Sequence, residues 1–212
     1  MSASDRRERE KNQRRAQILD AARQVLFAEG MAGASMNKIA RTAELSVGTL
    51  YVYFENQEEL FAALQEEGLD LLYAMIRRAT GGRVSPAEKL RRVARAYLTF
   101  SRRHRKYFDI YNYFLSSPEV TFPDELKRRI DRHGDRILSL VAGVLAEYAP
   151  EGPAGREPRR CALVFWSTLH GLLQFRKLRD TILAGENVDD LYHYSVDSLL
   201  KSFSENSPDP LV

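Results

Sequence analysis

The segment 36–60, MNKIARTAELSVGTLYVYFENQEEL, constrains the fold of this chain more than any other stretch. It predicts two short helices joined by a tight turn and followed at once by the start of a third helix. Ser35 and Ser46 stand where N-cap residues belong, and the first helix is expected over 35–42. Asn56, with Glu59 three residues later, has the spacing of a capping box. Two short helices at a steep angle suit insertion of the second into the major groove of DNA.

A specific pattern lies inside this segment, between Ile39 and Leu60: I-A-x-x-A-x-x-S-x-G-T-L-Y-x-Y-F-x-x-x-x-x-L. It closely resembles the DNA-binding signature of TetR-type repressors, and the resemblance covers roughly the first quarter to third of the chain. It implies an all-α homodimer with an N-terminal DNA-binding domain and a C-terminal domain for ligand binding and dimerisation. The implied partner of the first domain is double-stranded operator DNA.

Two residues depart from the family pattern. The turn between the two short helices usually holds Gly, where this chain has Glu44. A left-handed backbone there costs a non-glycine residue roughly 1 kcal/mol, so we expect Glu44 to be mildly strained. The family also often has Lys near the start of the third helix, where this chain has Gln57. One charge-assisted contact with phosphate is therefore expected to be missing.

The resemblance assigns DNA contacts residue by residue. Base edges and thymine methyl groups are expected to meet Val47, Gly48 and Tyr51, while Leu50 and Phe54 are expected to fill the core of the domain instead. This second helix lacks Arg, Asn and Gln for bidentate base readout, so apolar contact, DNA shape and Lys38 are expected to carry specificity. The full set of expected DNA-binding residues is Arg14, Arg15, Ser35, Lys38, Ser46, Val47, Gly48, Thr49, Tyr51, Tyr53 and Gln57.

Positive charge gathers at the N-terminus. The first 15 residues carry six basic side chains against three acidic ones, and this surplus of three equals the net charge of the whole chain, +3. We expect residues 1–11 to form a basic disordered arm before a first helix over 12–28, which Gly30 closes. Such an arm beside a helix-turn-helix suggests contact with phosphate or the minor groove, and a solvated tail is the alternative.

The remainder of the chain predicts helices only, about nine in all. The expected domains are the helix-turn-helix domain at 12–55, a linking helix at 56–80, a ligand-binding and dimerisation domain at 81–204, and a flexible tail at 205–212. Ser85 with Pro86 and Glu88 opens the first helix of the C-terminal domain. Further expected elements are an aromatic helix at 107–115, a loop from Pro118 to Pro123, a helix at 124–148, a loop at 150–158, and two final helices at 157–183 and 189–203.

The helix at 157–183 is apolar nearly all round between Leu163 and Phe175. Such a helix must be covered on more than one side. The cover is either a partner subunit or the core of the same chain. TetR-like proteins dimerise by pairing their last two helices, so the resemblance favours a homodimer through 157–183 and 189–203.

Aromatic residues are concentrated in the C-terminal part. Residues 97–114 hold seven aromatic side chains in 18 positions, where the 10% aromatic content of the chain predicts about two. We expect them to line a cavity for a small hydrophobic or aromatic effector, with ordinary core as the alternative. The expected effector-binding residues are Tyr97, Phe100, Tyr107, Tyr111, Phe114, Trp166 and His170.

Other classes of protein find little support in the sequence. The four histidines show no metal-ligand spacing, no phosphate-binding glycine loop is present, and no nucleophile stands beside a base, so we expect no metal, no cofactor and no enzymatic activity. The uncharged segment 161–175 is shorter than the ~20 residues that a membrane-spanning helix needs. A single cysteine, Cys161, and a charged N-terminus without an apolar segment favour the cytoplasm. The resemblance to TetR-type repressors therefore implies a ligand-responsive transcriptional repressor, with a DNA-binding structural regulator that takes no effector as the alternative.

Overall fold

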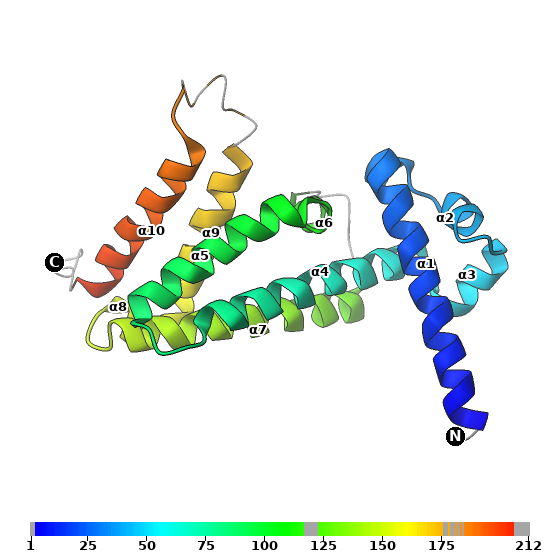
Figure 1. The fold of residues 1–212 in the computed structure, drawn as a ribbon, viewed down its shortest axis with the longest axis horizontal. Coiled ribbons are helices and arrows are strands. Elements are labelled where there is room, and N and C mark those ends of the chain that lie inside the picture. The colour runs from blue at the N-terminus through cyan, green and yellow to red at the C-terminus, as the bar shows by residue number, and fades with distance from the viewer. Residues whose placement is uncertain are drawn as a thin grey trace. The chain divides into compact units, whose positions relative to one another are not determined.

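The computed structural model describes residues 3–116, 123–175, 178, 181, 183 and 185–205, and these residues form helices without any strand. The all-α prediction is confirmed, with ten helices in the described ranges where about nine were expected (Figure 1). They are α1 (Ala3–Gly33), α2 (Met36–Thr42), α3 (Val47–Tyr53), α4 (Gln57–Thr80), α5 (Pro86–Arg103), α6 (Arg105–Ser116), α7 (Asp124–Tyr148), α8 (Pro153–Arg156), α9 (Pro158–Phe175) and α10 (Val188–Ser204).

The chain divides into two compact units. The first comprises Met1–Leu69 and Lys106–Asp131, and the second comprises Asp70–Arg105 and Arg132–Val212, so α4 and α7 contribute residues to both. The predicted domain boundary between the linking helix at 56–80 and the domain at 81–204 stays a prediction. The first unit includes α6 because Ile110 belongs to its buried core, with Tyr107 and Phe114 packed against that core.

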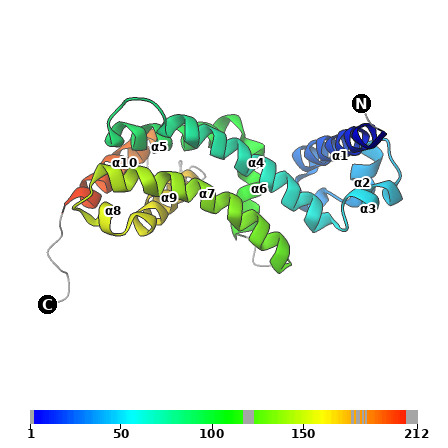
Figure 2. The same ribbon diagram turned by 90° about the horizontal axis from the view of Figure 1, so that it is seen from below.

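The first unit is built on α1. Figure 1 shows α2 and α3 packed to one side of α1, and Figure 2 shows the same grouping from below. The apolar residues of α1 that recur at helical spacing, such as Ile18 and Ala22, are fully buried against Ile39 of α2 and Leu50 of α3. This one-sided burial fixes the two short helices on a single rigid support.

The first helix corrects one prediction. It begins at Ala3, so residues 3–11, expected to be a disordered arm, are helical. Their Ala, Glu, Arg and Lys residues are strong helix formers and extend a helix that is already nucleated by its packed C-terminal half. Gly30 was predicted to close this helix. It instead lies at a kink within α1, with φ 71° and ψ −179°, a conformation that favours glycine, and α1 continues to Gly33.

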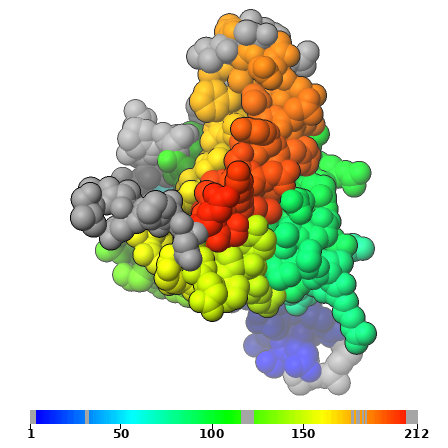
Figure 3. Space-filling model, turned by 90° about the vertical axis from the view of Figure 1, so that its left-hand side faces the viewer, coloured from blue at the N-terminus to red at the C-terminus, as the bar shows by residue number. Residues whose placement is uncertain are grey.

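In the second unit, α9 and α10 lie side by side (Figure 1), and Figure 3 shows α10 (orange to red) between α9 (yellow) and α5 (green). Tyr192 of α10 is fully buried, and its hydroxyl donates to the backbone oxygen of Ala94 in α5 at 2.8 Å. Arg91 of α5 and Asp197 of α10 form an ion pair at 2.9 Å between the same two helices. The side chains of α10 therefore hold it against α5 as well as α9.

Three further predictions concern the bounds of helices and loops in the C-terminal part of the chain. The last two helices were expected at 157–183 and 189–203, but α9 ends at Phe175, and Leu178 and Thr181 lie outside any α-helix. The segment 150–158 was expected to be a loop, but it contains the one-turn helix α8, which accounts for the tenth helix. The loop predicted from Pro118 to Pro123 and the tail predicted at 205–212 lie outside the described residues, apart from Pro123 and Glu205.

Candidate DNA-binding site

Local hydrogen bonds define the two short helices as the sequence predicts. The Ser35 hydroxyl accepts from the backbone N–H of Lys38 at 3.4 Å, and the Ser46 hydroxyl accepts from that of Thr49 at 3.0 Å. At the start of α4, the Asn56 side chain accepts from the N–H of Glu59, whose carboxylate accepts in return from the N–H of Glu55, both at 2.7 Å. The capping box is confirmed, with its return bond one residue earlier than the usual pattern.

The turn between α2 and α3 has the geometry that the glycine of the family pattern would serve. Glu44 has φ 54°, as expected, and among the described residues it is the only non-glycine residue with a positive φ. Its N–H donates to the Arg41 oxygen at 3.1 Å, and the N–H of Leu45 donates to the Ala40 oxygen at 2.9 Å. These two bonds form a Schellman motif, which ends α2 sharply and sets the angle at which α3 leaves.

The helix α3 separates an inward face from an outward face. Leu50 and the adjoining Phe54 are buried in the core of the first unit, as expected. Tyr51 and Val52 are 52% and 78% exposed, and Gly48 is exposed beside them. Val52 was absent from the expected contact set, although its place four residues after Gly48 puts both on one side of the helix. Thr49 is half-buried and its hydroxyl lies 2.8 Å from that of Ser46.

Several side chains that were expected to contact DNA form hydrogen bonds, an ion pair or a ring contact with other residues of the chain. The ammonium of Lys38 pairs with Glu29 of α1 and donates to the Gly33 oxygen at 3.0 Å. The Gln57 amide donates to the Ala34 oxygen at 3.0 Å, and Arg14 donates to Gln17 at 2.9 Å. The guanidinium of Arg15 lies 5.0 Å from the centre of the Phe54 ring. Lys38 therefore joins α2 to α1, Gln57 joins α4 to the segment before α2, and Arg15 joins α1 to the residue after α3. The bond of the exposed Arg14 lies within α1. Val47 and Tyr53 are half-buried against the same core.

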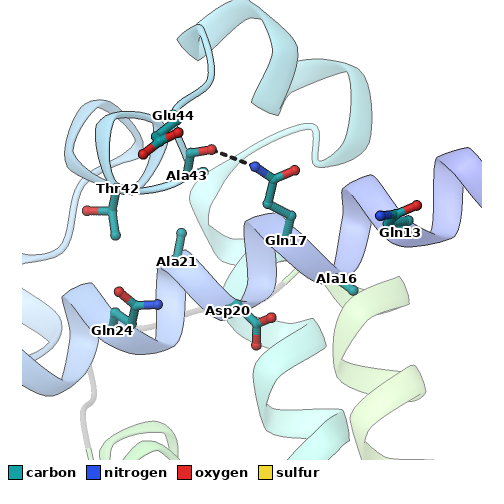
Figure 4. Close-up of a pocket in the computed structure, with 9 residues that line it drawn as sticks. All are labelled: Gln13, Ala16, Gln17, Asp20, Ala21, Gln24, Thr42, Ala43 and Glu44. Carbon is teal, nitrogen blue, oxygen red and sulfur yellow. Dashed lines mark hydrogen bonds between the residues drawn. The ribbon is translucent and has the colours of Figure 1, made fainter.

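A groove of about 420 Å³ runs between α1 and the turn that follows α2. Figure 4 shows Gln17 of α1 reaching across it, and its amide donates to the backbone oxygen of Ala43 at 2.8 Å. The other polar residues that line this groove include Gln13, Asp20, Gln24 and Glu44. The hydrogen bond from Gln17 joins the turn after α2 to the middle of α1. The position of α3, which follows this turn, therefore depends on α1.

The expected effector residues divide between the two units, with Tyr97, Phe100, Trp166 and His170 in the second. The Tyr97 hydroxyl lies 2.7 Å from Nδ1 of His170, and the rings of Trp166 and His170 are 5.5 Å apart. Burial lowers the pKa of His170 below its ordinary value, which favours the neutral imidazole. Phe100 is buried, with its ring centre 5.8 Å from that of His104. Tyr97, Trp166 and His170 thus form one aromatic cluster, and the Tyr97 hydroxyl and the His170 imidazole are its polar groups.

The other three expected effector residues, Tyr107, Tyr111 and Phe114, belong to α6 and hence to the first unit. The Tyr107 hydroxyl donates to Glu67 of α4 at 3.2 Å, and Glu67 in turn lies 3.5 Å from Nε of Arg23 in α1. Burial raises the pKa of Tyr107 and of Tyr111. Tyr107 and Phe114 therefore anchor α6 to the core that also supports α3.

The described residues contain no group of three or more His, Cys, Asp or Glu side chains placed to hold a metal ion. No helix within the described ranges combines the length and the apolar character that crossing a bilayer requires. Cys161 is buried, and burial raises the pKa of its thiol, which disfavours the reactive thiolate.

Known proteins with similar sequences are transcriptional regulators. The chain is 30% identical over 136 residues to the HTH-type transcriptional activator FasR of Mycolicibacterium smegmatis, a match that covers 62% of this chain and 60% of FasR. It is 36% identical over 84 residues to the HTH-type transcriptional regulator BetI of Paraburkholderia phytofirmans, covering 39% of this chain and 43% of BetI. The chain thus spans less than two thirds of the length of each of these relatives.

A similar fold occurs in the crystal structure of the transcriptional regulator FadR from Bacillus subtilis in complex with stearoyl-CoA. The two chains superpose with a TM-score of 0.69 at 20% identity, covering 88% of this chain and 98% of that one. Residues 18–64 match the family model for bacterial regulatory proteins of the tetR family. Residues 90–199, more than half of the chain, match the model for the tetracyclin repressor-like C-terminal domain. The chain therefore belongs to the TetR family of transcriptional regulators.

Proposed function

We propose that this TetR-family regulator is a homodimeric repressor that binds operator DNA through α3 and is released by a small hydrophobic or aromatic effector. The observation that carries the DNA-binding part is the outward face of α3, where Gly48, Tyr51 and Val52 are exposed on a helix whose opposite side is buried. Exposed apolar side chains on a short, well-supported helix cost solubility, so their presence favours a partner surface.

The chemistry of this face suits the major groove. Val52 and the ring of Tyr51 offer apolar surface for thymine methyl groups, and the Tyr51 hydroxyl can donate to phosphate or to a base edge. Gly48 leaves room for the groove edge, because a Cβ atom there would meet nothing nearer than the Ser46 hydroxyl at 3.8 Å. The predicted contact of Lys38 with DNA would require it to exchange its ion pair with Glu29 for a DNA group. Specificity would then rest on apolar contact and DNA shape.

Dimerisation is proposed through α9 and α10. On these helices Leu163, Val164 and Tyr194 are 40%, 44% and 72% exposed, although each is a large apolar or aromatic residue. A partner subunit would cover them and place two copies of α3 one helical turn of DNA apart, about 34–36 Å.

The effector is proposed to contact the cluster of Tyr97, Trp166 and His170. Its aromatic rings suit an apolar ligand, while the hydroxyl and imidazole provide a polar end for orientation. The stearoyl-CoA bound by the similar FadR makes long-chain acyl-CoA a reasonable first probe. Effector binding would shift the population toward a form in which α4 holds the DNA-binding helices at an unsuitable spacing. We propose no enzymatic activity and a cytoplasmic site of action.

The experiment is fluorescence anisotropy with a duplex covering the DNA upstream of the gene, compared with a scrambled duplex. The wild-type protein is expected to bind the first duplex far more tightly. Tyr51→Ala is expected to weaken this binding about tenfold or more, as loss of an aromatic side chain central to an interface does. Tyr51→Phe, which keeps the ring, separates apolar contact from hydroxyl contact. Weak, equal and steeply salt-dependent binding to both duplexes would contradict specific operator recognition.

The alternative, a DNA-binding structural regulator without an effector, is tested by thermal denaturation with stearoyl-CoA and a panel of aromatic metabolites. A ligand at 100 times its dissociation constant stabilises the folded protein by ~2.7 kcal/mol. Stabilisation that disappears in Trp166→Ala, together with weaker operator binding when the ligand is present, supports the repressor. FasR is named an activator, so a transcription assay with and without ligand decides the sign of regulation.

A further inference from the structure

The N-terminal part of α1 extends beyond the part of the chain that defines the family. The family match begins at residue 18, whereas α1 begins at Ala3. Every residue from Ser4 to Arg14 is exposed. In Figure 1 these dark-blue turns continue past α2 and α3 toward the N-terminus. A solvent-exposed helical extension of about three turns therefore adjoins the DNA-binding helices.

Three basic residues of this extension lie on one side of the helix. Arg7, Lys11 and Arg14 follow the spacing i, i+4, i+7, which aligns them along one side of the helix; we call them the basic stripe. The carboxylates that flank the stripe are drawn away from it. Glu10 pairs with Arg6 at 3.2 Å, and Glu8 accepts from the Asn12 amide at 3.5 Å. The stripe is therefore a positively charged edge rather than a mixture of compensating charges.

The helical spacing also shows on which side of α1 the basic stripe lies. Continuing the same spacing from Arg14 leads to Ile18 and then to Ala22, and both are buried against the core that α2 and α3 complete. Next to the stripe, the guanidinium of Arg15 stacks over Phe54, the residue that ends α3. The basic stripe thus lies on the side of α1 that carries α3, and it continues the candidate DNA-binding surface outward.

We propose that the N-terminal turns of α1 form a second DNA-contacting element, in which the basic stripe binds consecutive backbone phosphates on the flank of the operator. Arg7 and Arg14 are about 10 Å apart along the helix axis, since each residue rises 1.5 Å. Phosphates of one strand advance 3.4 Å per base pair along the DNA axis, so the stripe matches a run of about three. The partner is nucleic acid because of charge complementarity and continuity with α3.

This inference rests on the proposed operator binding, and its test uses full-length protein on a duplex that the wild-type protein enriches from a random-sequence library. The dissociation constant is measured across a salt series. Arg7→Gln with Lys11→Gln removes two charges from the stripe. Arg6→Gln with Arg9→Gln removes the same charge from the other side, where Arg6 pairs with Glu10 and Arg9 donates to the Asp5 oxygen at 3.2 Å.

The stripe variant is expected to reduce the slope of log K against log salt by about 2 per bound protomer, because each phosphate contact contributes about 0.9. The control variant is expected to change it by less than half as much. Trimming about 10 bp from each flank should erase the difference between wild type and stripe variant. Asn12→Pro keeps every charge but breaks the helix, so it should resemble the stripe variant.

Equal slopes for the stripe and control variants would overturn the inference, since the effect would then be one of net charge alone. Unchanged binding of Asn12→Pro would overturn it too, because a disordered arm would serve as well as a helix. Failure of the proposed function looks different: no duplex would be enriched, or Tyr51→Ala would bind the enriched duplex as tightly as wild type does. Circular dichroism of each variant checks that the helical domain remains folded.

Discussion

Glu44 stores strain in the turn on which the orientation of α3 depends. Its φ of 54° places a residue with a Cβ atom in the left-handed region, which costs roughly 1–2 kcal/mol. Glu44→Gly removes this strain but adds backbone freedom to the unfolded chain, which costs roughly 0.5–1 kcal/mol. We expect a net stabilisation of up to about 1 kcal/mol, measured by urea unfolding at fixed protein concentration.

Glu44→Ala is the matched control for this prediction, because it removes the same charge and keeps the Cβ atom. It should not stabilise the protein, whereas both variants should change DNA affinity by similar amounts. A stabilisation of equal size in the two variants would show that charge, and not backbone conformation, sets the cost of Glu44.

His170 links the stability of the second unit to pH. Burial lowers its pKa in the folded protein, so on acidification the unfolded chain takes up a proton before the folded protein does. The contribution of neutral His170 is complete above the ordinary histidine pKa of about 6.5 and is lost as pH falls from there through the lower folded-state pKa. We expect His170→Gln to reduce the loss of stability between neutral pH and that lower range, as followed by unfolding at several pH values.

Tyr97→Phe serves as the comparison, since it deletes the hydroxyl that lies 2.7 Å from Nδ1 of His170 and keeps the titrating group. It should lower stability by about 1 kcal/mol at neutral pH, and stability should still fall on acidification because the buried imidazole remains. If His170→Gln showed the same pH dependence as the wild-type protein, another group would be responsible.

At the level of the elements, features set by neighbouring residues were predictable from sequence. The caps at Ser35, Ser46 and Ser85 depend on one hydroxyl and an N–H three residues later, and all three are present. The helix 124–148 has the predicted bounds because its apolar residues recur regularly between Pro123 and Pro150. The positive φ of Glu44 was expected from the resemblance, because the family pattern usually holds Gly at this position.

Other features depended on signals that apolar periodicity does not contain. The N-terminal turns of α1 carry no apolar stripe, so the sequence suggested disorder, although the helix propensity of the residues suffices once the packed half is formed. The sequence between Phe175 and Gly185 contains no Pro or Gly to mark the end of α9, so its end at Phe175 could not be placed. The pairing of Lys38 with Glu29, and of Gln57 with the Ala34 oxygen, depends on tertiary contacts between distant residues.

At the scale of the whole molecule, the proposed function requires two DNA-binding domains held together in a dimer. We expect Leu163→Glu with Val164→Glu to convert the proposed dimer to monomer, because charges would be buried where α9 and α10 meet the partner. Sedimentation equilibrium measures the mass. Operator affinity should fall about 100-fold or more, since two linked domains gain 10²–10⁴ over one. Leu115→Glu on α6, at a position 51% exposed, is the control for placing a charge on exposed apolar surface.

The two readouts separate the roles of these helices. If the double variant became monomeric and still bound the operator with wild-type affinity, one domain would suffice and the proposed spacing mechanism would fail. If it remained dimeric, the interface would lie elsewhere, and Leu163 and Val164 would instead be surface residues that pack against nothing. Loss of both dimer and operator affinity, with Leu115→Glu unaffected, would support the pairing of α9 and α10 as the contact that sets the distance between the DNA-binding helices. In the proposed mechanism an effector acts by changing that distance, and operator DNA would weaken effector binding by the same factor by which effector weakens operator binding.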